Sequence, residues 1–271
     1  MRAGKLVLLA ALTVAGVAGA CAPLPVGGPV PARGVPGFDT RDYPGDGTMR
    51  RWFEASPYRW VGYYLPSPCY TGTTWTGRRS ALRQMGWGFA VLYVGEQDWS
   101  AIRPLAADTA GVAVQGARCT TANLTADFAA THAAEAAAAA SSDGFPDGTV
   151  IFLNVERVEH VSDALRSYIR AWAAGVLNGG RYLPGLYAHD HNASELFTVL
   201  AEEFVRHGRA DRPRLWVARG AGFDVARAPV ESGYAVAAVW QGRFDVRETW
   251  DDIALTIDVN VADSADPSRG R

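Results

Sequence analysis

Short apolar runs alternate with longer segments of helical periodicity along the chain from residue 35 onward. The apolar runs have the length of buried strands, whereas the longer segments repeat their apolar positions every three to four residues. The predicted strands are 35–39, 59–65, 88–95, 149–156, 182–189, 214–219, 236–241 and 255–261. The predicted helices are 47–56, 77–86, 122–142, 160–178 and 192–207. Apolar strands that alternate with helices indicate an α/β protein with a parallel sheet covered on its outside.

Eight strand-helix units in one chain favour a single (β/α)8 TIM-like barrel, which we place at residues 37–262. The last two connections contain little helical pattern, so we expect the barrel to be irregular near its closure. An open, doubly wound sheet is the alternative fold. No GxGxxG or Walker loop is found in the sequence, which weakens the nucleotide-binding form of that alternative and predicts no cofactor. Residues 263–271 are predicted to form a disordered tail.

The N-terminus has the features of an export signal. Arg2 and Lys5 precede an apolar run at 6–20, which ends in the small-residue motif AGA. The run is too short to span a membrane comfortably. We therefore interpret residues 1–20 as a cleaved signal peptide and expect the protein to be secreted or held at the outer face of the membrane or in the cell wall.

A lipoprotein is the competing interpretation, because Cys21 directly follows the cleavage motif. Lipid on Cys21 would then be the protein's attachment to the membrane, although Ala18 stands where the usual lipobox has Leu. Residues 21–36 are rich in Pro and Gly and are predicted to form an extended tether. The two remaining cysteines, Cys69 and Cys119, are expected to form a disulfide after export, with two separate buried thiols as the alternative.

The charge balance argues against nucleic acid as a partner. The chain has 26 basic and 28 acidic side chains, for a net charge of -2. This balance leaves no basic excess to hold a phosphate backbone. His189 and His191 have the spacing of a metal-binding pair, but no further ligand motif accompanies them. We therefore predict no metal site.

Polar and aromatic side chains fall at the ends of the predicted strands. They are Asp39, Tyr63, Tyr64, Glu96, Asn154, Glu156, Tyr187, His189, Trp216, Trp240, Gln241, Asp258 and Asn260. The carboxyl ends of barrel strands surround the active-site face, so we expect these side chains to meet there. Residues two apart on a strand point the same way, which places Asn154 beside Glu156. Carboxylates with Trp and Tyr at one barrel mouth suit glycoside hydrolysis, which needs a proton donor and a group that stabilises the oxocarbenium-like carbon.

The same segments resemble a known family. They are GFDTRDYP at 37–44, WVGYYL at 60–65, FAVLYVGEQ at 89–97, TVIFLNVE at 149–156, GLYAH at 185–189, LWVAR at 215–219, VWQ at 239–241 and IDVN at 257–260. Their order resembles the exported glycoside-hydrolase-like family called domain of unknown function 1906, over roughly residues 35–262. That family is similar to the glycoside hydrolase family 25 muramidases, which have a (β/α)8-like barrel.

The resemblance implies roles for the catalytic candidates. Asp39 matches the Asp that closes the first strand of those muramidases, and Asp258 matches an Asp in their last strand. Glu156 matches the Glu of their D-x-E motif and inherits the role of general acid. The sequence departs from the motif at Asn154, where the muramidases have Asp. A general acid must be protonated near neutral pH, so we expect the pKa of Glu156 to be raised by burial and the Asp charges.

The remaining strand-end candidates are expected to bind substrate. They are Asn154, Tyr63, Tyr187, Trp216, Trp240 and Gln241. Each has a structural alternative, since Trp and Tyr also fill cores and strand-end polar groups also pin loops. Two hypotheses follow. In the first, the protein is a glycosidase acting on cell-wall polysaccharide or peptidoglycan. In the second, it is a barrel with little or no turnover that binds the same glycan, which Asn154 favours.

Overall fold

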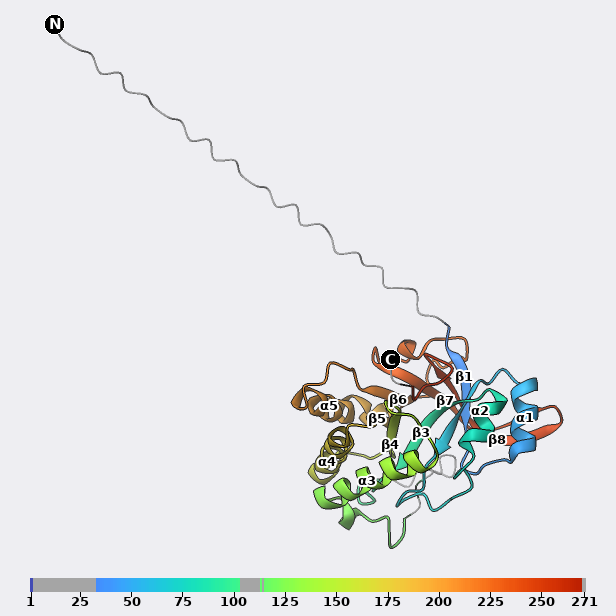
Figure 1. Cartoon of the computed structure of the whole chain (residues 1–271), viewed down its shortest axis with the longest axis horizontal. Helices are drawn as coiled ribbons and strands as arrows, with labels where there is room; N and C mark the ends of the chain where they lie inside the picture. The colour runs from blue at the N-terminus through green and yellow to red at the C-terminus, as the bar shows by residue number, and fades with distance from the viewer. Residues whose placement is uncertain (2–32, 103–112, 114, 270–271) are drawn as a thin grey trace. The chain divides into compact units, whose positions relative to one another are not determined.

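Eight strands close into one barrel in the order of the sequence (Figure 1). The computed structural model describes residue 1 and residues 33–102, 113 and 115–269. The strands are β1 (Val35–Asp39), β2 (Trp60–Tyr64), β3 (Gly88–Val94), β4 (Val150–Val155), β5 (Leu183–His189), β6 (Arg214–Ala218), β7 (Ala237–Trp250) and β8 (Ile253–Ala262). The predicted (β/α)8-like fold is therefore confirmed. The predicted signal peptide and Cys21 lie outside the described residues.

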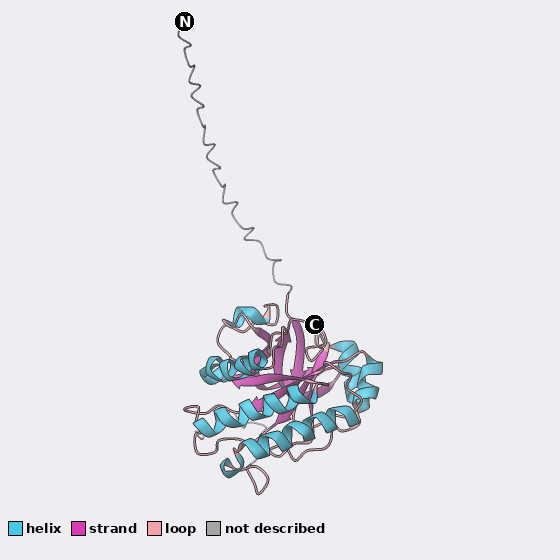
Figure 2. Cartoon of the chain, turned by 60° about the vertical axis from the view of Figure 1, so that its left-hand side comes forward, coloured by secondary structure: helices cyan, strands magenta, loops and turns pink. Residues whose placement is uncertain are grey.

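Helices cover the outside of the barrel between the early strands (Figure 2). They are α1 (Asp46–Ala55), α2 (Arg79–Met85), α3 (Ala126–Ser142), α4 (Asp163–Gly179) and α5 (Asp190–Arg206), with short 3-10 turns at Thr121–Asn123 and Pro229–Ser232. The helices α3, α4 and α5 are successive neighbours, and α1 packs beside α2. No helix in the described part of the chain is long and apolar enough to cross a membrane.

The last strand runs against its neighbours. Strands β1 to β7 pair in parallel, whereas β8 pairs antiparallel with both β7 and β1. The expectation of a wholly parallel sheet is therefore wrong at β8. A parallel pair needs a crossover of a dozen or more residues, but only Asp251 and Asp252 separate β7 from β8. Their φ angles of 49° and 59° fit the two-residue hairpin turn in which both central residues have positive φ.

Aromatic side chains fill both the barrel and the space beneath its helices. Inside the barrel, Trp216 meets Trp60 and Phe152 edge to face, at ring-centroid separations of 5.8 Å in both cases. Outside it, the Phe38 ring packs edge-on against Trp52 of α1 at 5.3 Å. Alternate residues of each strand thus fill two apolar layers, and the polar site residues lie at one end of the inner layer.

The predicted disulfide is confirmed. Cys69 and Cys119 are bonded, with their Cα atoms 4.9 Å apart, and both are buried. The bond ties the loop after β2 to the long connection between β3 and α3. The chain-entropy model assigns such a 50-residue closure a stabilisation of about 4 kcal/mol.

The C-terminal segment is packed, in contrast to the predicted disordered tail. Strand β3 begins at Gly88 but pairs with β4 only from Val91 onward, which leaves a gap in the ladder. Ser268 fills the gap: its N–H donates to the Phe89 carbonyl at 2.8 Å, and its carbonyl accepts from the Val150 N–H at 2.7 Å. Its hydroxyl oxygen also accepts from the Val91 N–H at 2.7 Å. Buried backbone groups need partners, and residues 266–269 supply them. The last two residues of the chain lie outside the described ones.

We expect Ser268→Ala to lower the free energy of unfolding by about 1–3 kcal/mol, because it leaves the buried Val91 N–H without its acceptor. Ser264→Ala, in the same segment, is the matched control and should change stability by less than about 0.5 kcal/mol. Urea unfolding of the domain with its disulfide intact measures both. Equal stabilities for the two variants would show that Ser268 does not complete the strand ladder.

Candidate functional site

Three carboxyl groups meet at the end of the barrel where the parallel strands finish. Asp39 is the last residue of β1, and Glu156 directly follows β4. Asp258 stands opposite Asp39 in the antiparallel register of β1 and β8. Asp258 was predicted to end the last strand, but β8 continues to Ala262. Asp258 lies at the same barrel mouth because β8 runs antiparallel to β1, which places the middle of β8 beside the carboxyl end of β1.

Hydrogen bonds hold Asp39 from both sides. The Tyr64 hydroxyl donates to Asp39 Oδ2 at 2.7 Å, and Asn260 Nδ2 donates to Asp39 Oδ1 at 2.8 Å. Trp216 Nε1 in turn donates to Asn260 Oδ1 at 3.0 Å, which fixes the orientation of the Asn260 amide. The carboxylate of Asp39 is therefore positioned by groups that belong to the barrel core.

Two donors also hold Asp258. Gln241 Nε2 donates to Asp258 Oδ2, and the backbone N–H of Asp245 donates to Asp258 Oδ1 at 2.7 Å. Asp245 lies at an irregularity in the β7–β8 ladder and has a φ of 50°, which turns its N–H toward the site. Gln241 Oε1 is buried and has no hydrogen-bond partner among the described residues.

Burial shifts the protonation of both Asp side chains. Desolvation raises the pKa of Asp39 to about 6, against the hydrogen bonds from Tyr64 and Asn260 that lower it. Desolvation, followed by the charge of Asp39, raises the pKa of Asp258 to about 8. Like charges in one buried site resist simultaneous ionisation. Near neutral pH the pair therefore holds one proton and one negative charge.

Glu156 has the opposite shift. Burial alone would raise the pKa of Glu156, but His189, the Asn154 amide and the backbone N–H of Ala113 together lower it. His189 Nε2 lies 3.8 Å from Glu156 Oε2, while Asn154 Nδ2 and the Ala113 N–H donate to Oε1 at 3.1 and 3.3 Å. The expectation of a raised pKa is therefore wrong. Asn154 donates a hydrogen bond to Glu156, whereas an Asp at this position would repel it. The sequence did not indicate the contact of Glu156 with His189.

Gln97 fixes the backbone that carries this pair. Its Nε2 donates to the Asn154 carbonyl at 2.9 Å, and its Oε1 accepts from the Glu156 N–H at 2.9 Å. Gln97 is buried in the connection that follows β3. The ends of β3 and β4 are therefore joined by a side-chain amide at the point where their ladder stops.

Tyr187 lies among all three carboxyls. Burial, and then the charges of Glu156, Asp39 and Asp258, raise the pKa of Tyr187 well above its usual value. The Tyr187 ring packs edge-on against Trp216, with the ring centroids 5.5 Å apart. Its side chain comes from β5 and points into the barrel mouth between β4 and β6.

Three residues that were expected to bind substrate do not lie at this mouth. Tyr63 is on the outer face of β2, where its hydroxyl donates to Asp143 Oδ2 at 2.7 Å. Trp240 is on the outer face of β7, and its Nε1 donates to the Arg219 carbonyl at 2.6 Å. Trp216 points inward but is fully buried in the barrel. All three make contacts with other parts of the barrel, whereas Asn154, Tyr187 and Gln241 do join the carboxyls.

Several residues at the site had been given no role. Tyr64 and Asn260 were noted at strand ends, but their contacts with Asp39 depend on the strand register. His189 was expected at a strand end of the active-site face, but its contact with Glu156 was not. Gln97 and Asp245 lie in a connection and at a strand irregularity, where periodicity gives no signal. The alternation of side chains along β2 could have predicted one of these contacts. Successive residues of a strand point to opposite faces, so only one of Tyr63 and Tyr64 can point into the barrel.

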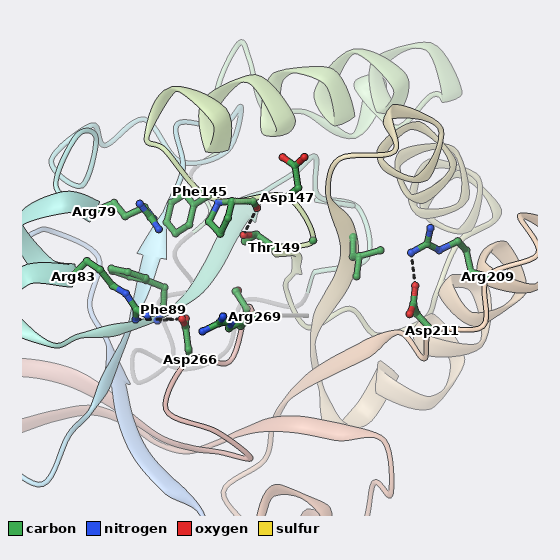
Figure 3. Close-up of a pocket in the computed structure, with 14 residues that line it drawn as sticks. Arg79, Arg83, Phe89, Phe145, Asp147, Thr149, Arg209, Asp211, Asp266 and Arg269 are labelled. Carbon is green, nitrogen blue, oxygen red and sulfur yellow. Dashed lines mark hydrogen bonds and ion pairs between the residues drawn. The ribbon is translucent and has the colours of Figure 1, made fainter. Parts of the chain in front are cut away.

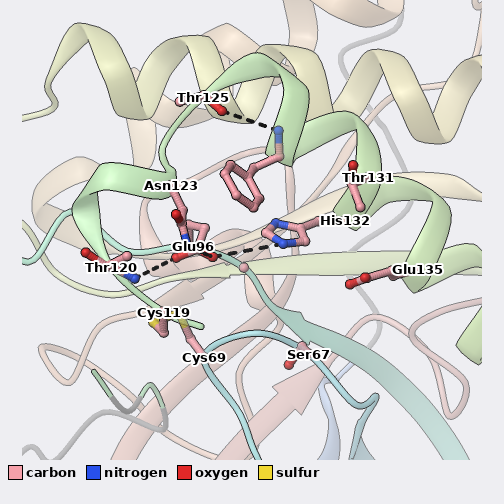
Figure 4. A network of polar contacts seen from close by, with 12 residues as sticks. Ser67, Cys69, Glu96, Cys119, Thr120, Asn123, Thr125, Thr131, His132 and Glu135 are labelled. Atoms are coloured by element: carbon pink, nitrogen blue, oxygen red, sulfur yellow. Dashed lines mark hydrogen bonds and ion pairs between the residues drawn. A yellow bond between two sulfur atoms is a disulfide. The ribbon is translucent and has the colours of Figure 1, made fainter. Parts of the chain in front are cut away.

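Glu96, which follows β3, turns away from the three carboxyls and joins a second polar cluster beside the disulfide (Figure 4). Its carboxylate accepts from the Thr120 N–H at 2.9 Å and lies 3.9 Å from His132 Nε2. In the described part of the chain, the one grouping with the spacing of metal ligands is Glu96 with Cys69 and Cys119. Both sulfur atoms of that grouping are already bonded to each other.

The barrel and its carboxyl cluster define a glycoside hydrolase-like domain. The family model of the Rv2525c-like glycoside hydrolase-like domain matches residues 51–262, so the chain belongs to this family. No curated protein matches the chain.

Solved structures share the fold at low sequence identity. The modular autolysin LytC from Streptococcus pneumoniae is 12% identical with a TM-score of 0.53, over 83% of this chain and 46% of LytC. The glycosyl hydrolase 25 GHIP from the same species is 12% identical with a TM-score of 0.51, over 84% of this chain and 86% of GHIP. The Tat-secreted protein Rv2525c from Mycobacterium tuberculosis is 14% identical with a TM-score of 0.50, over 84% and 94% of the two chains.

We expect Asp258→Asn to stabilise the protein at alkaline pH. The pKa of Asp258 rises from 3.8 to about 8 on folding, so between these values the native state holds a proton that the unfolded chain releases. Stability therefore falls as the pH rises through this window. The Asn variant lacks this loss, and its gain should be on the order of 5 kcal/mol near pH 8, at about 1.36 kcal/mol per pKa unit, and should vanish near pH 4.

Thermal unfolding across this pH range measures the effect. The exposed Asp42→Asn is the matched control for the loss of one carboxyl group. The same pH profile in wild type and in Asp258→Asn would contradict the raised pKa.

Proposed function

We propose that this protein is an exported hydrolase of N-acetylated cell-wall glycan, with Glu156 as the general acid. The observation that carries the proposal is the meeting of Glu156 with Asp39 and Asp258 at one barrel mouth in a glycoside hydrolase-like domain. LytC has been solved with a synthetic peptidoglycan ligand, which supports a cell-wall glycan as the substrate class. Export rests on residues 1–20 and on the disulfide between Cys69 and Cys119.

Asn154 decides the form of the reaction. An amide cannot replace a carboxylate nucleophile, so the carbonyl oxygen of the substrate's own N-acetyl group attacks the anomeric carbon. Glu156 gives its proton to the leaving oxygen as the glycosidic bond breaks. Water then opens the cyclic intermediate and returns a proton to Glu156. The Asp39–Asp258 pair retains one negative charge at neutral pH, which stabilises the positive charge that develops on the acetamido group.

His189 sets the pH at which this reaction runs. Glu156 acts only when it is protonated, and the contact with His189 lowers its pKa. Activity should therefore rise as the pH falls through the pKa of Glu156. A residue at position 189 that makes no contact with the carboxylate would therefore raise the pKa of Glu156.

We expect Glu156→Gln to reduce hydrolysis of purified peptidoglycan by at least about a hundredfold, because the variant has no proton to donate. Glu202→Gln, on the exposed face of α5, is the matched control and should keep full activity. Zymography and turbidity loss measure both variants. Full hydrolysis by Glu156→Gln, or equal turnover of glycan from which the N-acetyl groups have been removed, would exclude this mechanism.

We expect His189→Gln to move the alkaline limb of the kcat/KM profile to higher pH, because it removes a group that favours ionised Glu156. The profile is measured on a soluble N-acetylated oligosaccharide. An unchanged limb would show that His189 does not control the proton on Glu156.

A glycan-binding module with no turnover is the second candidate function. Asn154 in place of a carboxylate and the lowered pKa of Glu156 both favour it. Binding of peptidoglycan fragments by wild type and by Glu156→Gln with equal affinity, with neither protein hydrolysing them, would establish this function instead.

A further inference from the structure

A cavity of about 480 Å³ lies at the end of the barrel opposite the three carboxyl groups, where the strands begin (Figure 3). Its walls include Phe89 near the start of β3, Thr149 just before β4, Leu183 at the start of β5, and Ser268 in the packed C-terminal segment. The candidate site lies at the carboxyl ends of the same strands. The six-residue step from Leu183 to His189 along β5 corresponds to about 20 Å, so the cavity is separate from that site.

Most charges around this cavity already have partners. Its three acidic residues are each in an ion pair, Asp147 with Arg181, Asp211 with Arg209 and Asp266 with Arg83. Arg79 and Arg269 also line the cavity, and neither has a carboxylate partner among the described residues. The cavity is therefore lined by two guanidinium groups that no carboxylate of the described residues neutralises.

Arg79 is held in place by contacts that do not neutralise its charge. Its guanidinium carbon lies 5.0 Å from the centroid of the Phe145 ring. Its Nε is buried and has no hydrogen-bond partner in the described part of the chain. Such a guanidinium keeps donors for an anion, because the cation–π contact occupies the face of the group and leaves its N–H edge.

The geometry points to a binding site for a phosphorylated sugar or polyol, with the phosphoryl group between Arg79 and Arg269. The planar fork of a guanidinium matches two phosphate oxygens, and two forks match a doubly charged group. The cavity is larger than a lone phosphate needs and falls in the range of small-molecule sites. Phe89, Phe145 and Leu183 supply an apolar wall for the carbon skeleton of the ligand.

Glycerol 3-phosphate and glycerol, titrated into the full mature protein by calorimetry at constant ionic strength, test this site. We expect binding of the phosphate ester alone, weakened at least tenfold in Arg79→Gln and in Arg269→Gln. The exposed Arg50→Gln on α1 removes the same charge away from the cavity and should change the affinity less than twofold. No binding by wild type at millimolar ester, or wild-type affinity in both cavity variants, would overturn the assignment.

A second titration with a soluble poly(glycerol phosphate) chain separates the two sources of this chemistry. Binding of both the chain and the monomer, lost together in Arg79→Gln, assigns the site to a phosphate-bearing polymer. Binding of the monomer alone assigns it to a free phosphorylated metabolite. Both titrations are also made on Glu156→Gln, so that the result does not depend on the proposed hydrolysis.

Discussion

The antiparallel pairing of β8 with β1 determines the chemistry of the barrel mouth. It closes the sheet and places Asp258 opposite Asp39, so that a buried and a half-buried carboxyl group share one site. Water cannot solvate both charges there, and the pair keeps a proton that exposed Asp residues would release. A parallel last strand would reverse the direction of β8 and lose this register.

The core of the barrel supports the site directly. Trp216, packed between Trp60 and Phe152, orients Asn260 by a hydrogen bond, and Asn260 orients Asp39. Substitutions in the aromatic interior are therefore expected to change the orientation of Asp39 through the side-chain amide of Asn260. Glu156 belongs to a different group: His189 and Asn154 favour its ionised form. The mouth thus combines a proton-holding Asp pair with an ionised Glu. In the mechanism that we propose, Glu156 donates a proton only after glycan binding or a lower pH has protonated it.

The sequence predicted most of the fold because local patterns specify most of it. Strand and helix periodicity located β1 to β6 and all five helices of the described chain. The direction of β8 was not predictable in this way, because an apolar strand reads the same for either direction, and only the two-residue connection from Trp250 to Ile253 excludes a crossover. The C-terminal segment was misjudged because Ser268 gains its stability from a gap in a distant strand ladder.

The sequence predicted the site residues only where they lie at the ends of recognisable strands. Asp39 and Glu156 were found there, but adjacent tyrosines at 63 and 64 needed the register to separate the inward side chain from the outward one. Protonation was the least predictable property, since the pKa of Glu156 depends on His189, which comes from a different strand. Sequence motifs identify which groups are present, whereas neighbouring strands decide their charge.

Carbon-13 NMR titration of the side-chain carboxyls of Asp and Glu in the labelled protein tests this account most directly. Resonance assignments from Asp258→Asn, Asp39→Asn and Glu156→Gln identify the three groups. We expect Asp258 to titrate at about pH 8, Asp39 at about pH 6, and Glu156 below the usual range of Glu. An ordinary titration of Asp258 together with a raised pKa for Glu156 would contradict it.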